Sequence, residues 1–248
     1  MSADVYFMKG SDLMEWLNTL YTSFYNALIP EKRYLAYISG VKITLMVALF
    51  AVFLGVLIGI LVAVVKVSAK SSKNPVIKPL AAFCNFYTTV IRGTPLIVQI
   101  MIIYNLIFTA RDSNEIIIGT VCFGINSGAY VSEIIRAGIE SVARGQTEAG
   151  RSLGFTHIQT MRYIILPQAI KNILPALGNE FIVLVKETSV ISVIAVNDLT
   201  KMASFIGSRT WDILPPYIIA AVIYLLITMC LTAVLGHFER RMSQGDHH

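Results

Sequence analysis

Residues 43–65 read ITLMVALFAVFLGVLIGILVAVV, 23 consecutive positions without a charged side chain. A bilayer core about 30 Å thick needs about 20 helical residues at about 1.5 Å each, so this run is long enough to cross a membrane. The whole composition agrees, because 55% of the residues are hydrophobic and only 14% are charged, against roughly a quarter charged in an ordinary globular domain. We therefore expect a membrane protein and not a soluble enzyme.

Four further apolar runs continue this pattern. They occupy residues 79–108, 116–132, 173–196 and 213–236, and the first of them is interrupted at Arg92-Gly93-Thr94-Pro95. Only helices and closed barrels satisfy their backbone hydrogen bonds in lipid, so the sequence predicts an all-α bundle of five transmembrane helices. We expect an aromatic-rich interfacial segment at 1–34, the membrane domain at 35–241 and a short tail at 242–248.

Basic residues gather between the apolar runs. They are concentrated in residues 66–78, in residues 136–171 and after residue 236. The positive-inside rule puts these segments in the cytoplasm, which places the N-terminus outside and the C-terminus inside. A nucleic-acid partner is not expected, since no single basic stretch is interleaved with aromatic residues. Residues 1–33 mix acids and bases without a long apolar core, so no cleaved signal peptide is expected.

The sequence predicts no catalytic and no metal site. The Gly-x-x-x-x-Gly-Lys-Ser/Thr loop that cradles ATP phosphates is absent, so the chain is not expected to bind a nucleotide in that way. Cys84, Cys122 and Cys230 stand singly in or beside apolar runs, which favours inert apolar roles over metal or redox chemistry. We expect no enzyme and no cofactor in this chain.

The longest polar block, 136–171, has its own helix signals. A helix from about Thr147 can end at Gly154, because glycine tolerates the left-handed conformation of a helix stop. Thr156 and Gln159 then have capping-box spacing for a second helix, which Pro167 is expected to end. Two short helices joined at a glycine form a compact projection, although such caps also fit a plain connection between two spans.

The block also resembles the signature of the permease subunits of bacterial ABC importers. Glu-Ala at 148–149, Gly154 and the Ile-x-Leu-Pro at 164–167 match that signature, with Gly150 where the usual motif has Ala. The resemblance implies a coupling helix that docks into a cleft of a cytoplasmic ATPase subunit. The coupling residues it implies are Glu148, Ala149, Gly150, Gly154, Leu166 and Pro167.

The resemblance covers roughly residues 38–241. The segments 92–96, 127–139 and 178–189 look like the polar amino acid branch of that family, the histidine, glutamine, arginine and cystine type. It implies a type I importer in the bacterial inner membrane. Its other parts would be a second permease, identical or homologous, an ATPase dimer that binds ATP and Mg, and an extracytoplasmic substrate-binding protein.

Polar side chains inside the predicted spans are candidate substrate contacts, because charges in a bilayer are costly and rare. Arg92 and Lys186 lie at similar depth, roughly 20 Å of helix from the inner face, and the fork-shaped guanidinium of Arg92 suits a substrate carboxylate. The predicted substrate-binding residues are Arg92, Thr94, Gln99, Asn126, Ser127, Lys186, Glu187, Thr188 and Ser189, and the predicted gate residues are Asn179 and Glu180.

Other interpretations stay open at this point. Arg92, Lys186 and Glu187 equally fit ion pairs that lock the bundle, and Asn179 and Glu180 fit a helix cap. An ion-coupled secondary carrier or channel would use intramembrane charges without a coupling loop. A membrane anchor for a signalling complex would use the loop without the buried polar residues. The sequence does not indicate which amino acid is carried.

Overall fold

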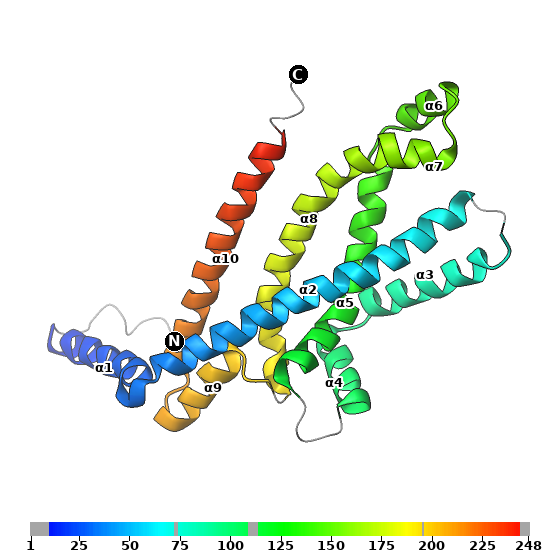
Figure 1. Ribbon diagram of the computed structural model, residues 1–248. Coiled ribbons are helices and arrows are strands. Elements are labelled where there is room, and N and C mark those ends of the chain that lie inside the picture. The colour runs from blue at the N-terminus through cyan, green and yellow to red at the C-terminus, as the bar shows by residue number, and fades with distance from the viewer. Residues whose placement is uncertain (1–9, 72–73, 109–113, 195, 244–248) are drawn as a thin grey trace.

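The computed structural model describes residues 10–71, 74–108, 114–194 and 196–243, and in these residues it contains helices and no strands (Figure 1). The α-helices are α1 (Gly10–Leu28), α2 (Tyr34–Ser71), α3 (Ile77–Gly93), α4 (Leu96–Ile107), α5 (Glu115–Glu140), α6 (Arg144–Ser152), α7 (His157–Thr160), α8 (Leu166–Glu187), α9 (Leu199–Thr210) and α10 (Leu214–Ser243). Short 3-10 turns η2 (Pro30–Lys32) and η4 (Thr188–Val193) and a π turn η3 (Met161–Ile165) join some of them. The all-α prediction is confirmed.

Three described helices are long and apolar enough to cross a membrane. They lie in Pro30–Lys70, Glu115–Glu140 and Leu214–Arg241, and the α3–α4 pair qualifies only if it counts as one bent span. Helix α8 does not meet that test and carries four charged residues, Lys171, Glu180, Lys186 and Glu187. The expected total of five spans therefore stays a prediction. The predicted tail at 242–248 lies partly outside the described residues.

The interruption predicted at residues 92–95 is confirmed as a sharp bend. Helix α3 ends at Gly93, Thr94 is extended at φ −119° and ψ 151°, and α4 starts after Pro95. Extended backbone is what a residue before proline prefers, because the proline ring clashes with a helical predecessor. The two helix axes differ by 115°. The second apolar run is thus a broken helix, and residues 92–95 at the bend are exposed in the single chain.

Two expected spans have clearly different limits in the structure, and one helix was not predicted. Helix α5 continues through the predicted end at 132 to Glu140, since its terminal charges pair with one another and with α2. Helix α8 spans 166–187 instead of 173–196, because residues 188–193 of that run form the separate η4 turn. Helix α9 was not predicted from its mixed sequence, although Asp198 caps it by accepting from the backbone N–H groups of Thr200 and Lys201.

Helices α2 and α5 make the tightest contact of the bundle. Gly55 and Gly59 on α2 face α5, and Gly124 and Gly128 on α5 face α2. A Cβ atom added at any of the four would come within 2.5–2.7 Å of a side chain on the other helix. Small residues four positions apart let membrane helices approach closely, and the gain is van der Waals contact along the whole seam.

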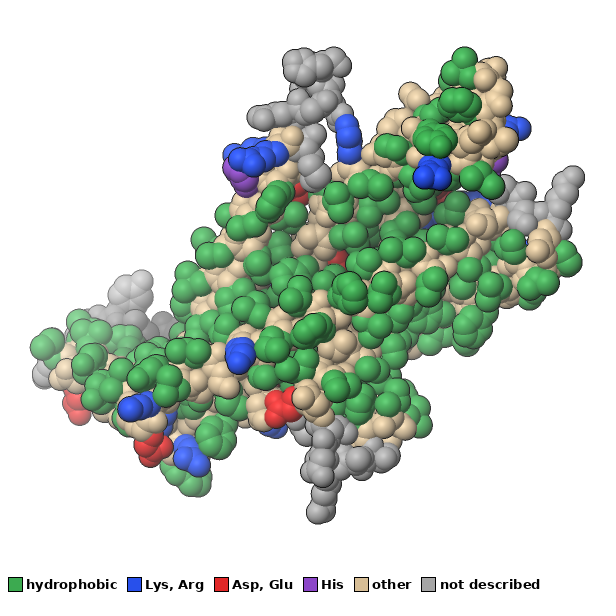
Figure 2. All heavy atoms as spheres, in the orientation of Figure 1, with side chains coloured by type: hydrophobic (Ala, Val, Ile, Leu, Met, Phe, Trp, Pro, Cys, Tyr) green, Lys and Arg blue, Asp and Glu red, His purple; other side chains and the backbone are tan. Residues whose placement is uncertain are grey.

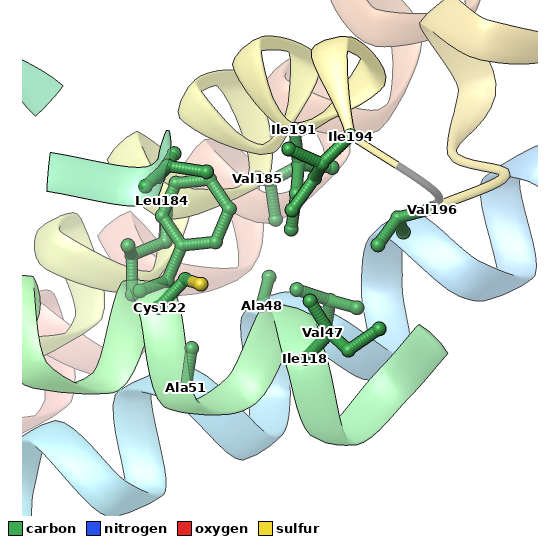
Figure 3. Close-up of a cluster of buried hydrophobic side chains, with 12 residues drawn as sticks. Val47, Ala48, Ala51, Ile118, Cys122, Leu184, Val185, Ile191, Ile194 and Val196 are labelled. Atoms are coloured by element: carbon green, nitrogen blue, oxygen red, sulfur yellow. The ribbon is translucent and has the colours of Figure 1, made fainter. Parts of the chain in front are cut away.

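The apolar core lies where α2, α5, α8 and η4 meet (Figure 3). Val47 of α2, Ile118 of α5, Leu184 of α8 and Ile191 of η4 are among its fully buried side chains. Outside this core, apolar side chains cover most of the visible face (Figure 2), and α10 is almost entirely uncovered in the single chain. A surface of this kind requires lipid or another subunit around it.

Candidate functional site

The projection predicted at 136–171 exists and stands at one end of the bundle, where α6 and α7 lie side by side (Figure 1). We call residues 144–165 the knob. Helix α6 ends in a Schellman motif, because the N–H of Phe155 donates to the carbonyl of Gly150 at 3.1 Å and that of Gly154 donates to Arg151 at 3.0 Å. Gly154 has φ +86°, so the predicted left-handed stop is confirmed. Helix α6 starts at Arg144, slightly earlier than expected.

The second part of the knob begins as predicted and ends differently. Thr156 and Gln159 form the complete capping box at the start of α7. The expectation that Pro167 ends this helix is wrong, since η3 leads directly into α8 and Pro167 lies in the first turn of α8. Proline suits that position because its missing N–H has no helical partner there. The knob is therefore continuous with α8.

Gly150 holds the two arms of the knob together. It is buried, and a Cβ atom at this position would lie 2.7 Å from Cδ1 of Ile164 and 3.0 Å from Cγ2 of Thr160. Thr160 is itself buried and donates its hydroxyl to the carbonyl of Thr156 at 3.0 Å. This close contact is the physical reason why glycine fits where the signature usually has alanine.

The outer surface of the knob combines charged and apolar side chains. Leu153 is 76% exposed and Ile158 is 77% exposed, and both belong to the knob. Glu148 and Ala149 are exposed on α6 beside them. Apolar side chains held out on capped, glycine-fixed helices are typical of a protein-docking surface.

A hydrogen-bonded junction fixes the bend between α3 and α4. The buried side-chain amide of Gln99 donates to the carbonyls of Ile91 at 2.6 Å and Thr94 at 2.9 Å, and to the Thr94 hydroxyl at 2.8 Å. The buried Asn126 of α5 donates to Oε1 of Gln99 at 2.8 Å. Three predicted substrate residues, Thr94, Gln99 and Asn126, thus meet, and they satisfy one another's hydrogen bonds.

Arg92 lies at the edge of a charge cluster centred on Glu133. Lys66 of α2 donates to Oε1 of Glu133 at 2.6 Å, and Arg136 reaches Oε2 at 2.8 Å. Arg92 is more distant, 3.8 Å from Oε2, and its guanidinium stands 5.7 Å from the centre of the Tyr130 ring. Its side chain is 48% exposed, so the guanidinium remains accessible.

Sequence reasoning did not select Lys66, Glu133 or Arg136 as site residues. Lys66 and Glu133 lie 67 positions apart, and no local pattern in the sequence indicates that they touch. Lys70 pairs with Glu140 in the same region, and Glu140 also accepts from Arg136. Together the cluster ties α2, α3 and α5 to one another.

The predicted residues of α8 divide between its two sides. Glu180 points inward and accepts from the hydroxyl of Ser127 at 2.9 Å. Asn179 and Lys186 are exposed, and Asn172, which donates to Ser141 at 2.9 Å, lies seven residues before Asn179 on the same face. These three side chains form a polar row along α8. Glu187 and Ser189 are half-buried beyond it, and Thr188 is buried and bonded to Val185.

Comparisons with known proteins agree with this architecture. Residues 55–244 match the model of a family described as the binding-protein-dependent transport system inner membrane component. The arginine transport system permease protein ArtQ of Bacillus subtilis is 36% identical over 224 residues, 90% of this chain and 98% of that protein. The L-cystine transport system permease protein TcyB of the same species is 44% identical over 171 residues, 68% of this chain and 73% of that protein.

A solved structure gives the same result for the fold. A chain described as an amino acid ABC transporter with histidines superimposes with a TM-score of 0.76 at 43% identity, covering 95% of this chain and 99% of that chain. The family match extends over the knob, the broken α3–α4 pair from Ile77 onward and all of α8. The chain therefore belongs to the family of binding-protein-dependent transport system inner membrane components.

Proposed function

We propose that this chain is the permease subunit of an ATP-driven importer of a polar amino acid, with its N-terminus outside and its C-terminus inside the bacterial inner membrane. Membership of the family makes the chain a transport subunit whose ATPase resides in a separate subunit. The proposed substrate class follows the arginine and cystine permeases to which the chain is similar. The observation that carries the proposal is the knob, a rigid and exposed helix pair continuous with α8.

The knob is the proposed docking element for the cytoplasmic ATPase dimer. Glu148 and Ala149 would contact the ATPase directly, because both are exposed on α6. Gly150 and Gly154 would set the shape of the knob through close packing and the left-handed turn. The six coupling residues end with Leu166 and Pro167 in the first turn of α8, so a displacement of the knob is transmitted along that helix.

The polar row on α8 is the proposed wall of the transport path. Asn179 and Lys186 are exposed within the predicted span 173–196, with Asn172 at its cytoplasmic end, and facing lipid would cost the charged side chain of Lys186 about 3 kcal/mol or more. A water-filled path completed by a second permease removes that cost. The nearly uncovered α10 also calls for a large contact with lipid or with that second subunit. Asn179 would then gate the path, with Glu180 behind it.

Arg92 is the proposed contact for the substrate carboxylate. Its guanidinium is accessible, and the cluster contains more basic than acidic groups, namely Lys66, Lys70, Arg92 and Arg136 against Glu133 and Glu140. Gln99 and Asn126 would act indirectly by holding the bend at Thr94. Lys186, Glu187, Thr188 and Ser189 would complete the outer part of the site, with Ser127 supporting Glu180.

Uptake by reconstituted vesicles tests the proposal. Vesicles with this chain, its ATPase and a substrate-binding protein should accumulate a polar amino acid only when ATP is supplied on the ATPase side. Replacing the ATPase by a hydrolysis-deficient variant should abolish uptake without changing the amount of assembled complex. Uptake driven by an ion gradient in vesicles that lack the ATPase would instead establish the secondary-carrier alternative.

A further inference from the structure

An apolar groove of about 1000 Å³ runs along the outside of the bundle between α2, α5, α8 and the base of the knob. Its walls are formed by aliphatic side chains, including Val56, Ile60 and Val64 of α2 and Ile170 and Leu174 of α8. None of the residues of the proposed transport path lines it, and of the six proposed coupling residues only Leu166 does. The groove is thus a separate feature of the membrane-embedded surface.

The groove lies on the side of α8 opposite the polar row. At 3.6 residues per turn, Ile170 and Leu174 of the groove point about 120–180° away from Asn172, Asn179 and Lys186. A face turned away from an aqueous path and lined by aliphatic side chains is suited to hydrocarbon. Along α2 the lining extends from Val56 to Ser68, about 18 Å of helix. That length is close to one bilayer leaflet, whose hydrocarbon is about 15 Å thick.

The polar groups of the groove are confined to one end. Ser68, His157 and Arg162 line the mouth beside the knob, and all other lining residues are apolar. Arg162 has no carboxylate partner in the described part of the chain. Its guanidinium stands 5.6 Å from the centre of the neighbouring Tyr163 ring, a cation–π contact. An apolar groove one leaflet long with a cation at its interfacial end complements a phospholipid, whose acyl chain is apolar and whose phosphate is an anion.

We propose that this groove binds an anionic phospholipid of the cytoplasmic leaflet, with an acyl chain along α2 and α8 and the phosphate beside Arg162. Basic pockets between membrane helices on the cytoplasmic side attract anionic head groups. The leaflet follows from the orientation given under the proposed function, whereas the lipid site itself does not depend on the transported substrate. Ile158 and Met161 also line the groove, so the bound lipid contacts the base of the knob and stabilises η3.

Lipid binding is measured on the purified complex of permease and ATPase by native mass spectrometry. The complex is delipidated in detergent and titrated with dioleoyl-phosphatidylglycerol or, separately, with dioleoyl-phosphatidylcholine. The variants are Arg162→Gln, which removes the head-group cation, and Leu174→Trp, which fills the groove. Arg241→Gln is the matched control, because Arg241 is an exposed basic residue of the last turn of α10 and does not line the groove.

Arg162→Gln should weaken phosphatidylglycerol binding about five-fold, since one basic group near an anionic head group contributes about that factor. It should leave phosphatidylcholine binding unchanged. Leu174→Trp should weaken the binding of both lipids, and Arg241→Gln the binding of neither.

The proposal is overturned if Arg162→Gln or Leu174→Trp binds phosphatidylglycerol as the wild type does, or if Arg241→Gln loses as much affinity as Arg162→Gln. It is also overturned if Arg162→Gln weakens both lipids equally, or if it releases the ATPase in lipid-free detergent, which would make Arg162 an ATPase contact. ATP-driven uptake is scored separately, so failure of the lipid site leaves the proposed function intact.

Discussion

Replacement of Gly154 tests whether the shape of the knob sets ATPase coupling. Gly154 has φ +86°, and a Cβ atom added there meets no other atom within 4 Å, so any cost comes from the backbone alone. A left-handed conformation costs an L-residue about 1–2 kcal/mol, which lowers the population of the native turn roughly five- to thirty-fold. Gly154→Ala should therefore weaken ATPase association by up to this factor while the subunit still inserts into the membrane.

Two matched variants isolate the backbone effect. Gly154→Asn should be milder than Gly154→Ala, because asparagine enters the left-handed region more readily than other side chains. Gly145→Ala adds the same methyl group in open space on the same helix at a position without positive φ, and should keep association close to wild type. Association is measured by titrating detergent-solubilised permease with the ATPase, and uptake follows in vesicles. Normal ATPase association and uptake of Gly154→Ala, or equal impairment of Gly145→Ala, would exclude a coupling role for the left-handed turn.

Four other predictions follow from the site and its surroundings. Arg92→Gln should abolish uptake yet change the free energy of unfolding by no more than about 1 kcal/mol, because the pair of Arg92 with Glu133 is long and half exposed. Normal uptake, or loss of assembly in a thermal melt, would contradict the substrate role. Gln99→Leu should lower stability in the same melt by about 1–3 kcal/mol, since buried polar groups lose their partner. Single cysteines at Asn114 and Gln159 should react with impermeant label from outside and from the cytoplasm respectively, and the reverse pattern would overturn the orientation. Burial raises the pKa of Asp198, which lies between spans, above its ordinary value near 3.8. Its contribution to stability is therefore full below that value and lost as the pH rises. The melting temperature of Asp198→Asn relative to that of the wild type should therefore be higher at pH 7 than at pH 4.

Local signals in the sequence predicted the local structure well. The uncharged run 43–65 lies within α2, the Gly-Thr-Pro segment breaks the second run, and Gly154 with Thr156 defines the centre of the knob. Each of these depends on a few neighbouring residues and on strong steric or hydrogen-bonding rules. They needed no knowledge of the rest of the fold.

Features that depend on distant contacts were missed or misplaced. Pro167 fits both a helix end and a helix start, and only the packing of η3 against α6 decides for the start. The ion pair of Lys66 with Glu133 joins two predicted spans, and no local pattern indicates their register. The roles of Arg92, Lys186 and the gate residues stay predictions, because they concern a substrate and a second subunit rather than contacts within one chain.

The glycine seam between α2 and α5 limits how the subunit can move. Along this seam the side chains of each helix occupy the space left by the missing Cβ atoms of the other, so neither helix can slide or rotate without collision. The pair therefore behaves as one stiff frame during any change of conformation. Motion driven through the knob has to be absorbed elsewhere, by tilting α8 against this frame. A cross-link between α2 and α5 should consequently leave a working cycle intact, whereas one between α8 and α5 should arrest it.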